Sequence, residues 1–279
     1  MSTATPKRLH APLPNLAAWV ACLRSAPIPV LAGTAAAIGE LIDHEDALDA
    51  HTIAESIGAD PLMTLKLLSH VGTVSRRETD VETVTAALVL MGVGPFFRAF
   101  SSLVTIEDAL CDMPDALAGA RAVIERSHRA ARFALGFAAQ RFDPDAALLH
   151  EAALLHDFAE LLLWCHAPGL ALQIAHRQAT DATLRSADAQ LAVLGIELSA
   201  LQQALMKAWR LPALLIRLGD DNNAEASQVR NVLLAVRVAR HSAGGWDNAA
   251  LPDDVAAVGA LLQLSSTSAL KLLRDIDES

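Results

Sequence analysis

Apolar residues recur along most of this chain at the three- and four-residue spacing of amphipathic helices, and no stretch alternates long enough to indicate a strand. In the segment 30–44, for example, one helix face collects Leu31, Ala35, Ile38 and Ile42. Proline, glycine and capping residues separate the apolar segments from one another. The pattern therefore predicts an all-helical (all-α) fold.

The breaks in the pattern give approximate bounds for the predicted helices. These are residues 16–25, 30–44, 50–57, 61–72, 81–91, 96–109, 113–140 (as one or two helices), 148–166, 169–179, 183–194, 198–209, a short helix from Pro212, 224–242, 252–265 and 266–276. Residues 73–80 are polar and predict a loop. Asn15 and Asp49 can cap the helices that follow them, and Asp60 stands before a proline, which is typical of a helix start.

Residues 148–166 form an apolar run that contains the adjacent pair His156 and Asp157. Five ionisable residues interrupt the run, so it predicts a buried helix of a soluble protein and not a membrane span. A carboxylate beside an imidazole in such surroundings must be hydrogen-bonded or bound to a metal. The spacing differs from the HExxH motif of zinc proteases, because His150 and His156 lie about 120° apart on a helix. Both interpretations of the pair stay open, and we favour the structural one.

The amino-acid composition favours a helical fold and argues against some classes of function. Hydrophobic residues make up 53%, aromatic residues 4%, and tyrosine is absent, which favours helices over sheets. The net charge of −10 argues against a nucleic-acid binder, which needs a basic face. Three distant cysteines form no zinc-binding spacing, and the start of the chain has no apolar core of signal-peptide length. We expect a cytoplasmic protein with no cofactor and no membrane contact.

Residues 49–70 have the order of a helix-turn-helix: a helix, a glycine turn and a second helix. DNA recognition requires arginine or lysine against phosphates and bases, whereas the second helix carries only Lys66 as a permanent cation. Two packed core helices are therefore the favoured interpretation, and a DNA-binding regulator is an alternative.

Three stretches together resemble one family, the HDOD domains, which are HD-related output domains of bacterial signalling proteins. The first stretch holds the proline pair of Pro27-Ile28-Pro29, then IAESIGADPLMTLKLL and ALVLMG. The second is Arg126-Ser127 followed by ALLHD, and the third is VLGIELSALQQALMKAWRLP. The stretches stand in the family's order and span residues 24–240.

The resemblance implies two helical bundles, the second of them HD-domain-like. We place the N-terminal bundle at residues 24–112 and the HD-like bundle at 113–240, with a tail and short helix at 1–23 and a helical extension at 241–279. It also implies a regulatory role in signal transduction, often in nucleotide second-messenger pathways. The partners would be signalling proteins, with a homodimer as a further candidate.

The candidate site is a degenerate version of the HD site of the related phosphohydrolases. Arg126 stands where HD enzymes place their first metal-binding histidine, and His128 is about 200° round the helix from it. Glu160 replaces the lysine that follows the HD pair, and it could orient His156. For Arg126 we favour an ion pair with Asp157 over binding of a phosphate.

Two further positions depart from the HD enzymes. Leu198 stands where a histidine is usual, and Asp220, Asp221 and Asn222 replace a histidine pair. A metal, if any, would have only His156 and Asp157 as ligands. The resemblance and these departures predict a non-catalytic signalling module that acts through protein contacts, with a link to cyclic-dinucleotide pathways as a further expectation. A metal-dependent HD-type phosphohydrolase that uses the HD pair is the alternative.

Overall fold

All regular structure in the described ranges is helical, apart from one isolated parallel bridge between Val30 and Thr105. The structure is a computed structural model that describes residues 8–74, 82–181 and 183–278. The predicted all-α fold is confirmed. No single helix within these ranges is long and apolar enough to cross a membrane, whereas three bent helix pairs reach that length and composition together.

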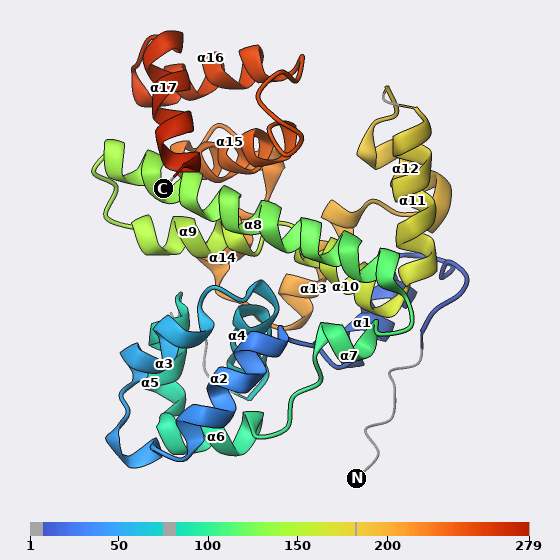
Figure 1. The fold of residues 1–279 in the computed structure, drawn as a ribbon, viewed down its shortest axis with the longest axis vertical. Coiled ribbons are helices and arrows are strands. Elements are labelled where there is room, and N and C mark those ends of the chain that lie inside the picture. The colour runs from blue at the N-terminus through green and yellow to red at the C-terminus, as the bar shows by residue number, and fades with distance from the viewer. Residues whose placement is uncertain (1–7, 75–81, 182, 279) are drawn as a thin grey trace. The chain divides into compact units, whose positions relative to one another are not determined.

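Figure 1 shows the helices in chain order. They are α1 (Leu16–Ser25), α2 (Ala32–Ile42), η1 (Glu45–Ala47), α3 (Ala50–Ile57), α4 (Pro61–Val74), α5 (Val84–Met91), α6 (Val93–Phe100), α7 (Ile106–Ala109), α8 (Pro114–Gln140), α9 (Ala146–Leu154), α10 (Phe158–His166), α11 (Pro168–Thr180), α12 (Ser186–Leu194), α13 (Leu198–Ala208), α14 (Ala213–Leu218), η2 (Asp221–Asn223), α15 (Ser227–His241), α16 (Leu251–Leu262) and α17 (Ser266–Asp277).

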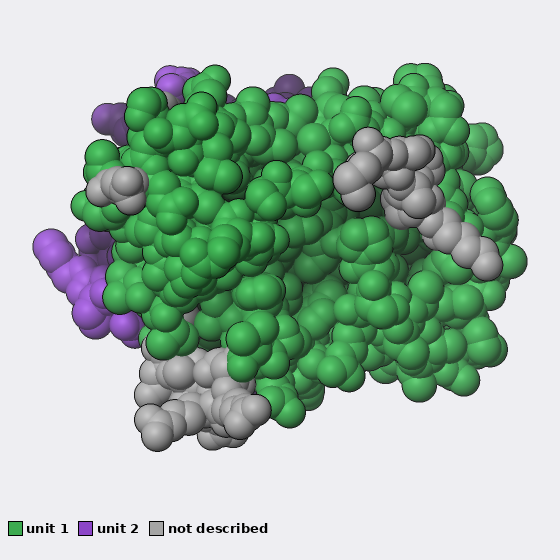
Figure 2. Space-filling view, turned by 90° about the horizontal axis from the view of Figure 1, so that it is seen from below, with its two compact units in different colours: residues 1–123, 157–212 green, residues 124–156, 213–279 purple. Residues whose placement is uncertain are grey.

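The chain forms two compact units, coloured green and purple in Figure 2: residues 1–123 with 157–212, and residues 124–156 with 213–279. The two units divide within α8, after residue 123, whereas the sequence places the boundary between the bundles at 112–113. In unit 1, α1 packs against α13, and α10 packs against both α4 and α13. In unit 2, α16 packs against α15 and α17, so the expected C-terminal extension is part of that unit's core.

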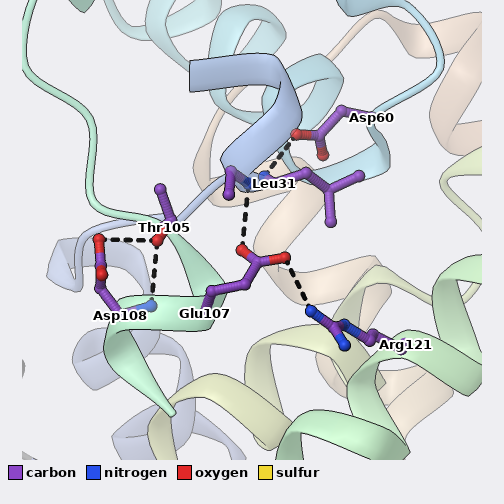
Figure 3. A network of polar contacts seen from close by, with 7 residues as sticks. Leu31, Asp60, Thr105, Glu107, Asp108 and Arg121 are labelled. Atoms are coloured by element: carbon purple, nitrogen blue, oxygen red, sulfur yellow. Dashed lines mark hydrogen bonds and ion pairs between the residues drawn. The ribbon is translucent and has the colours of Figure 1, made fainter. Parts of the chain in front are cut away.

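Asp60 organises the centre of unit 1 through a network of hydrogen bonds (Figure 3). One carboxylate oxygen accepts from the backbone N–H groups of Leu62 and Met63, at 2.8 and 3.1 Å, and so caps α4. The other oxygen accepts from the N–H of Leu31 at 2.8 Å, just before α2 begins. Asp60 is 1% exposed, and burial raises its pKa although these N–H donors act to lower it.

A second set of contacts joins the start of α2 to α7. Glu107 accepts from the backbone N–H of Ala32 at 3.0 Å and lies 3.5 Å from a guanidinium nitrogen of Arg121 on α8. Thr105 caps α7 by accepting from the N–H of Asp108 at 3.0 Å, and its hydroxyl donates to that residue's carboxylate. These polar contacts hold the start of α2 and the helix α7 together. All the residues that form them belong to unit 1.

Two predicted helices have different bounds in the structure. α4 continues past Gly72 to Val74. The predicted helix 96–109 is two helices, because α6 ends at Phe100 and α7 begins at Ile106. Between them the chain pairs with Val30, which donates to the carbonyl of residue 104 and accepts from the N–H of Ile106, each at 2.9 Å. This long-range pairing interrupts a segment whose local periodicity is helical throughout.

Unit 2 is held by two clusters of charged side chains. Arg129 on α8 binds Asp277 on α17 with two hydrogen bonds of 2.8 Å and also donates to Ser242. Asp254 on α16 is fully buried and lies 2.6 Å from a guanidinium nitrogen of Arg237 on α15. Two N–H groups of Arg129 thus point at the one carboxylate of Asp277, which is the bidentate geometry of strong arginine–carboxylate pairs.

Candidate functional site

The predicted helix 148–166 is broken at the HD pair, and this prediction is wrong. α9 ends at Leu154 and α10 begins at Phe158, with His156 and Asp157 in the turn between them. The N–H of His156 donates to the carbonyl of Ala153, and the carbonyl of Asp157 accepts from the N–H groups of Glu160 and Leu161. The turn therefore presents both side chains from a bend and not from the face of a straight helix.

His156 is paired with a carboxylate of unit 2. Its Nε2 lies 3.0 Å from a carboxylate oxygen of Asp221, the first residue of η2. The His156 side chain is 11% exposed and that of Asp221 is 45% exposed. A neutral imidazole would donate its Nε2 proton to this oxygen, and a protonated imidazole would form an ion pair with it. Either form gives His156 a partner that is not a metal.

The sequence interpretation did not identify Asp221 as this partner. It noted only that acidic residues replace the usual histidine pair at 220–222. The acidic residues at 220–222 were the signal that could have indicated this contact, since a carboxylate can accept a proton from an imidazole nitrogen. Asp220 caps the 3-10 helix η2, which carries Asp221. Its carboxylate accepts from the N–H of Asn222 at 3.2 Å.

His128 and His150 lie close together in unit 2. Burial lowers the pKa of His150, and the charge of nearby His128 on α8 lowers it further. The side chains of His128 and His150 are half-buried, and so is that of Arg126. Neutral imidazole is therefore the favoured state of His150 at neutral pH.

The five candidate residues are divided between the two units. Arg126, His128 and His156 belong to unit 2, whereas Asp157 and Glu160 belong to unit 1. The ion pair of Arg126 with Asp157 and the contact of Glu160 with His156 therefore stay predictions. Leu198, where a histidine was expected by resemblance, is a buried residue at the start of α13.

The donor set does not fit a hydrolytic metal centre. Such a centre needs several ligands that converge on one ion and an open position for water. Within the described ranges, no group of three or more histidine, cysteine, aspartate or glutamate side chains could hold a metal ion. We therefore derive no chemistry through a metal at this site.

The helix-turn-helix interpretation meets a steric obstacle in α4. A recognition helix must expose one face to enter the major groove. Nine of the 14 residues of α4 are buried, and Lys66 is turned to the carbonyl of Ile28, at 2.7 Å from its Nζ. The helix is packed as a core element of unit 1, as the interpretation of two packed helices expects.

Comparisons with known proteins agree with this fold. The family model of the HDOD domain matches residues 28–222, and no curated protein matches the chain. The chain is similar to the MmoQ response regulator from Methylococcus capsulatus str. Bath, with 22% identity, a TM-score of 0.68, and coverage of 90% of this chain and 99% of that one. It is also similar to a virulence factor from Campylobacter jejuni subsp. jejuni, with 18% identity, a TM-score of 0.63, and coverage of 95% and 99%. At these identities the likeness is one of fold.

Proposed function

The chain belongs to the HDOD domain family, and we propose that it is a non-catalytic regulatory module of bacterial signal transduction. It acts through contacts with other signalling proteins, and its output feeds pathways that use cyclic dinucleotides. The regulatory role and this link rest on the resemblance to HDOD output domains. The non-catalytic character rests on the residues at the HD position.

The pairing of His156 with Asp221 is the observation that carries the proposal. In a metal-dependent site the imidazole lone pair must point at the ion. Here the Nε2 atom lies 3.0 Å from a carboxylate oxygen, which favours a proton on that nitrogen and removes the lone pair. Arg126, at the position of the first metal-binding histidine, adds a guanidinium that cannot ligate a cation and would repel one.

Metal analysis and a hydrolysis assay on the purified protein test the non-catalytic part. We expect iron, manganese and zinc well below one equivalent, and no hydrolysis of bis(p-nitrophenyl) phosphate with added Mn²⁺ or Fe²⁺. His156→Ala and the matched control His44→Ala, at an exposed position of unit 1, should behave like the parent. The alternative phosphohydrolase requires hydrolysis by the parent and the control that is lost in a folded His156→Ala protein.

Asp157→Ala separates a structural carboxylate from a catalytic one. We expect the variant to be less stable than the parent. Removal of the Asp157 carboxylate would leave the polar group that it pairs with unsatisfied. Thermal unfolding would measure the loss. A variant that keeps the parent's stability and loses a hydrolytic activity present in the parent would contradict the structural role.

Co-purification of the full chain from its native cell, followed by mass spectrometry, tests the protein contacts. The expected result is one or a few signalling proteins retained in amounts comparable to the bait. A bait that emerges alone, also after chemical crosslinking in the cell, would overturn the proposal that it works through stable protein contacts.

A further inference from the structure

Unit 1 contains a pocket of about 330 Å³ that is lined on one side by α4. Its walls come from the end of α1, the proline-rich segment after it, α4, the end of α6 and the residue that follows α13. All these elements belong to the same unit. The volume lies at the lower end of the range for small-molecule sites, so the pocket suits a small ligand.

The pocket is basic in a protein that is acidic as a whole. The side chains of Arg24, Lys66 and His70 line it, and no aspartate or glutamate does among the described residues. The chain nevertheless carries a net charge of −10. Nitrogen donors gathered in one concavity attract an anion, because the low-dielectric walls strengthen the field of the cations inside it.

Lys66 is the central donor of the pocket. Its Nζ donates to the carbonyl oxygen of Ile28 at 2.7 Å, and no carboxylate of the described residues forms an ion pair with it. An ammonium group has three N–H donors, so this contact leaves others for a ligand. Burial lowers the pKa of Lys66, while the charge of Asp60 acts in the opposite direction.

His70 lies one helix turn from Lys66, on the same face of α4. Its ring contacts that of Phe100 edge to face, with centroids 5.4 Å apart. Burial, followed by the charge of Lys66, lowers the pKa of His70. An anion between the two side chains would relieve this repulsion.

The apolar wall of the pocket is rigid. Phe100 and Trp209 are 3% and 4% exposed, so little of either ring can move without opening the core. α4 approaches the end of α13 closely at Gly72, where an added Cβ would lie 2.5 Å from the carbonyl oxygen of Trp209. The indole Nε1 of Trp209 is 3.4 Å from the carbonyl of Arg24. Because both rings border the pocket, an apolar group of a ligand can lie against their exposed edges next to the cationic end.

We propose that this pocket binds a small organic phosphate, with its phosphate group on Lys66, Arg24 and His70 and its apolar part against Phe100 and Trp209. A guanidinium and an ammonium are the side chains that phosphate prefers. The pocket lies wholly in unit 1 and uses none of the HD-position residues, so the inference is independent of the proposed function.

Phenyl phosphate and inorganic phosphate are the probes, and isothermal titration calorimetry of the full chain is the measurement. We expect phenyl phosphate to bind more tightly than inorganic phosphate, because it also covers the aromatic wall. Lys66→Met should weaken phenyl phosphate binding about tenfold or more, as loss of a charged hydrogen bond does. Lys207→Met is the matched control, since Lys207 is exposed on α13 and outside the pocket lining, and it should bind like the parent.

Arg24→Gln keeps the test valid if Lys66→Met unfolds, because Arg24 is exposed at the end of α1. It should weaken binding several-fold, with an unchanged circular dichroism spectrum. The inference is overturned if the parent binds neither probe at about 10 mM, which is weaker than any affinity of use in recognition. It is also overturned if the pocket variants bind like the parent, or if Lys207→Met weakens binding as much as they do.

Discussion

Replacement of Asp60 by alanine should destabilise unit 1 more than loss of a helix cap explains. The carboxylate is 1% exposed and accepts three backbone N–H groups, those of Leu31, Leu62 and Met63. Alanine would leave these donors buried without a partner. One such donor costs about 1–3 kcal/mol, and a lost cap costs about 1 kcal/mol. Because the contributions are not additive, we expect a total loss of about 3–5 kcal/mol.

Asp60→Asn separates the two functions of the carboxylate. Asparagine caps a helix about as well as aspartate, and its one carbonyl oxygen can serve Leu62 and Met63. The amide NH₂ would then face the N–H of Leu31, where an acceptor is needed. We therefore expect a loss of about 1–2 kcal/mol, which is the cost of one unsatisfied buried donor.

Urea unfolding followed by tryptophan fluorescence would measure these losses. Three of the four tryptophans, Trp19, Trp164 and Trp209, lie in unit 1, so the signal mainly reports that unit. Asp49→Ala is the control, because Asp49 caps α3 with a local hydrogen bond to Thr52 at 2.8 Å and has no distant partner among the described contacts. The reasoning is refuted if Asp60→Ala loses no more stability than Asp49→Ala, or if the asparagine and alanine variants are equal.

Two further predictions follow from buried groups of unit 1, and a third follows from the net charge of the chain. Burial lowers the pKa of His166 below its ordinary value of 6.5, so the unfolded state binds more protons and stability should fall as the pH drops below about 6.5. His166→Asn should flatten this dependence in unfolding curves between about pH 7.5 and 5.5; an unchanged slope would contradict it. Gly119→Ala should destabilise the protein by about 1–3 kcal/mol, because its Cβ would lie 2.5 Å from the ring of buried Trp164, and a melting temperature equal to the parent's would exclude the clash. Binding to random duplex DNA should be weak at physiological salt, and micromolar affinity that falls steeply with salt would overturn this.

Local signals in the sequence predicted the helices where a cap or a breaker lies beside the apolar run. Asn15 and Asp49 cap α1 and α3 as expected, each by accepting an N–H three residues on. The break at 155–157 was missed, because the apolar residues continue through it at helical spacing and only the bend in the backbone reveals it. The pairing of Val30 with residues 104–106 was missed for a related reason, since no local pattern encodes a partner so far along the chain.

The same limit applies to the candidate site. The sequence indicated His156 as its centre, and it showed acidic residues at 220–222 as a departure from a family pattern. That the departure supplies the partner of His156 follows only from the fold, which brings η2 to the turn after α9. The basic pocket has the same origin: Arg24, Lys66 and His70 come from two helices that are separated by the proline-rich segment and α2 and α3.

The HD position shows how a half-buried histidine can be satisfied by a carboxylate. A half-buried imidazole needs a partner for its ring nitrogens whether or not an ion is bound. In a metal site the ion is that partner, and the surrounding carboxylates balance its charge. Here a carboxylate oxygen of Asp221 lies 3.0 Å from Nε2 of His156 and is such a partner. In the proposed non-catalytic module, a guanidinium such as that of Arg126 is tolerated in the same unit, because that module binds no cation there for it to repel. Substitution of Asp221 alone would leave the imidazole without this partner and would not restore a metal site, since the other ligands would still be missing.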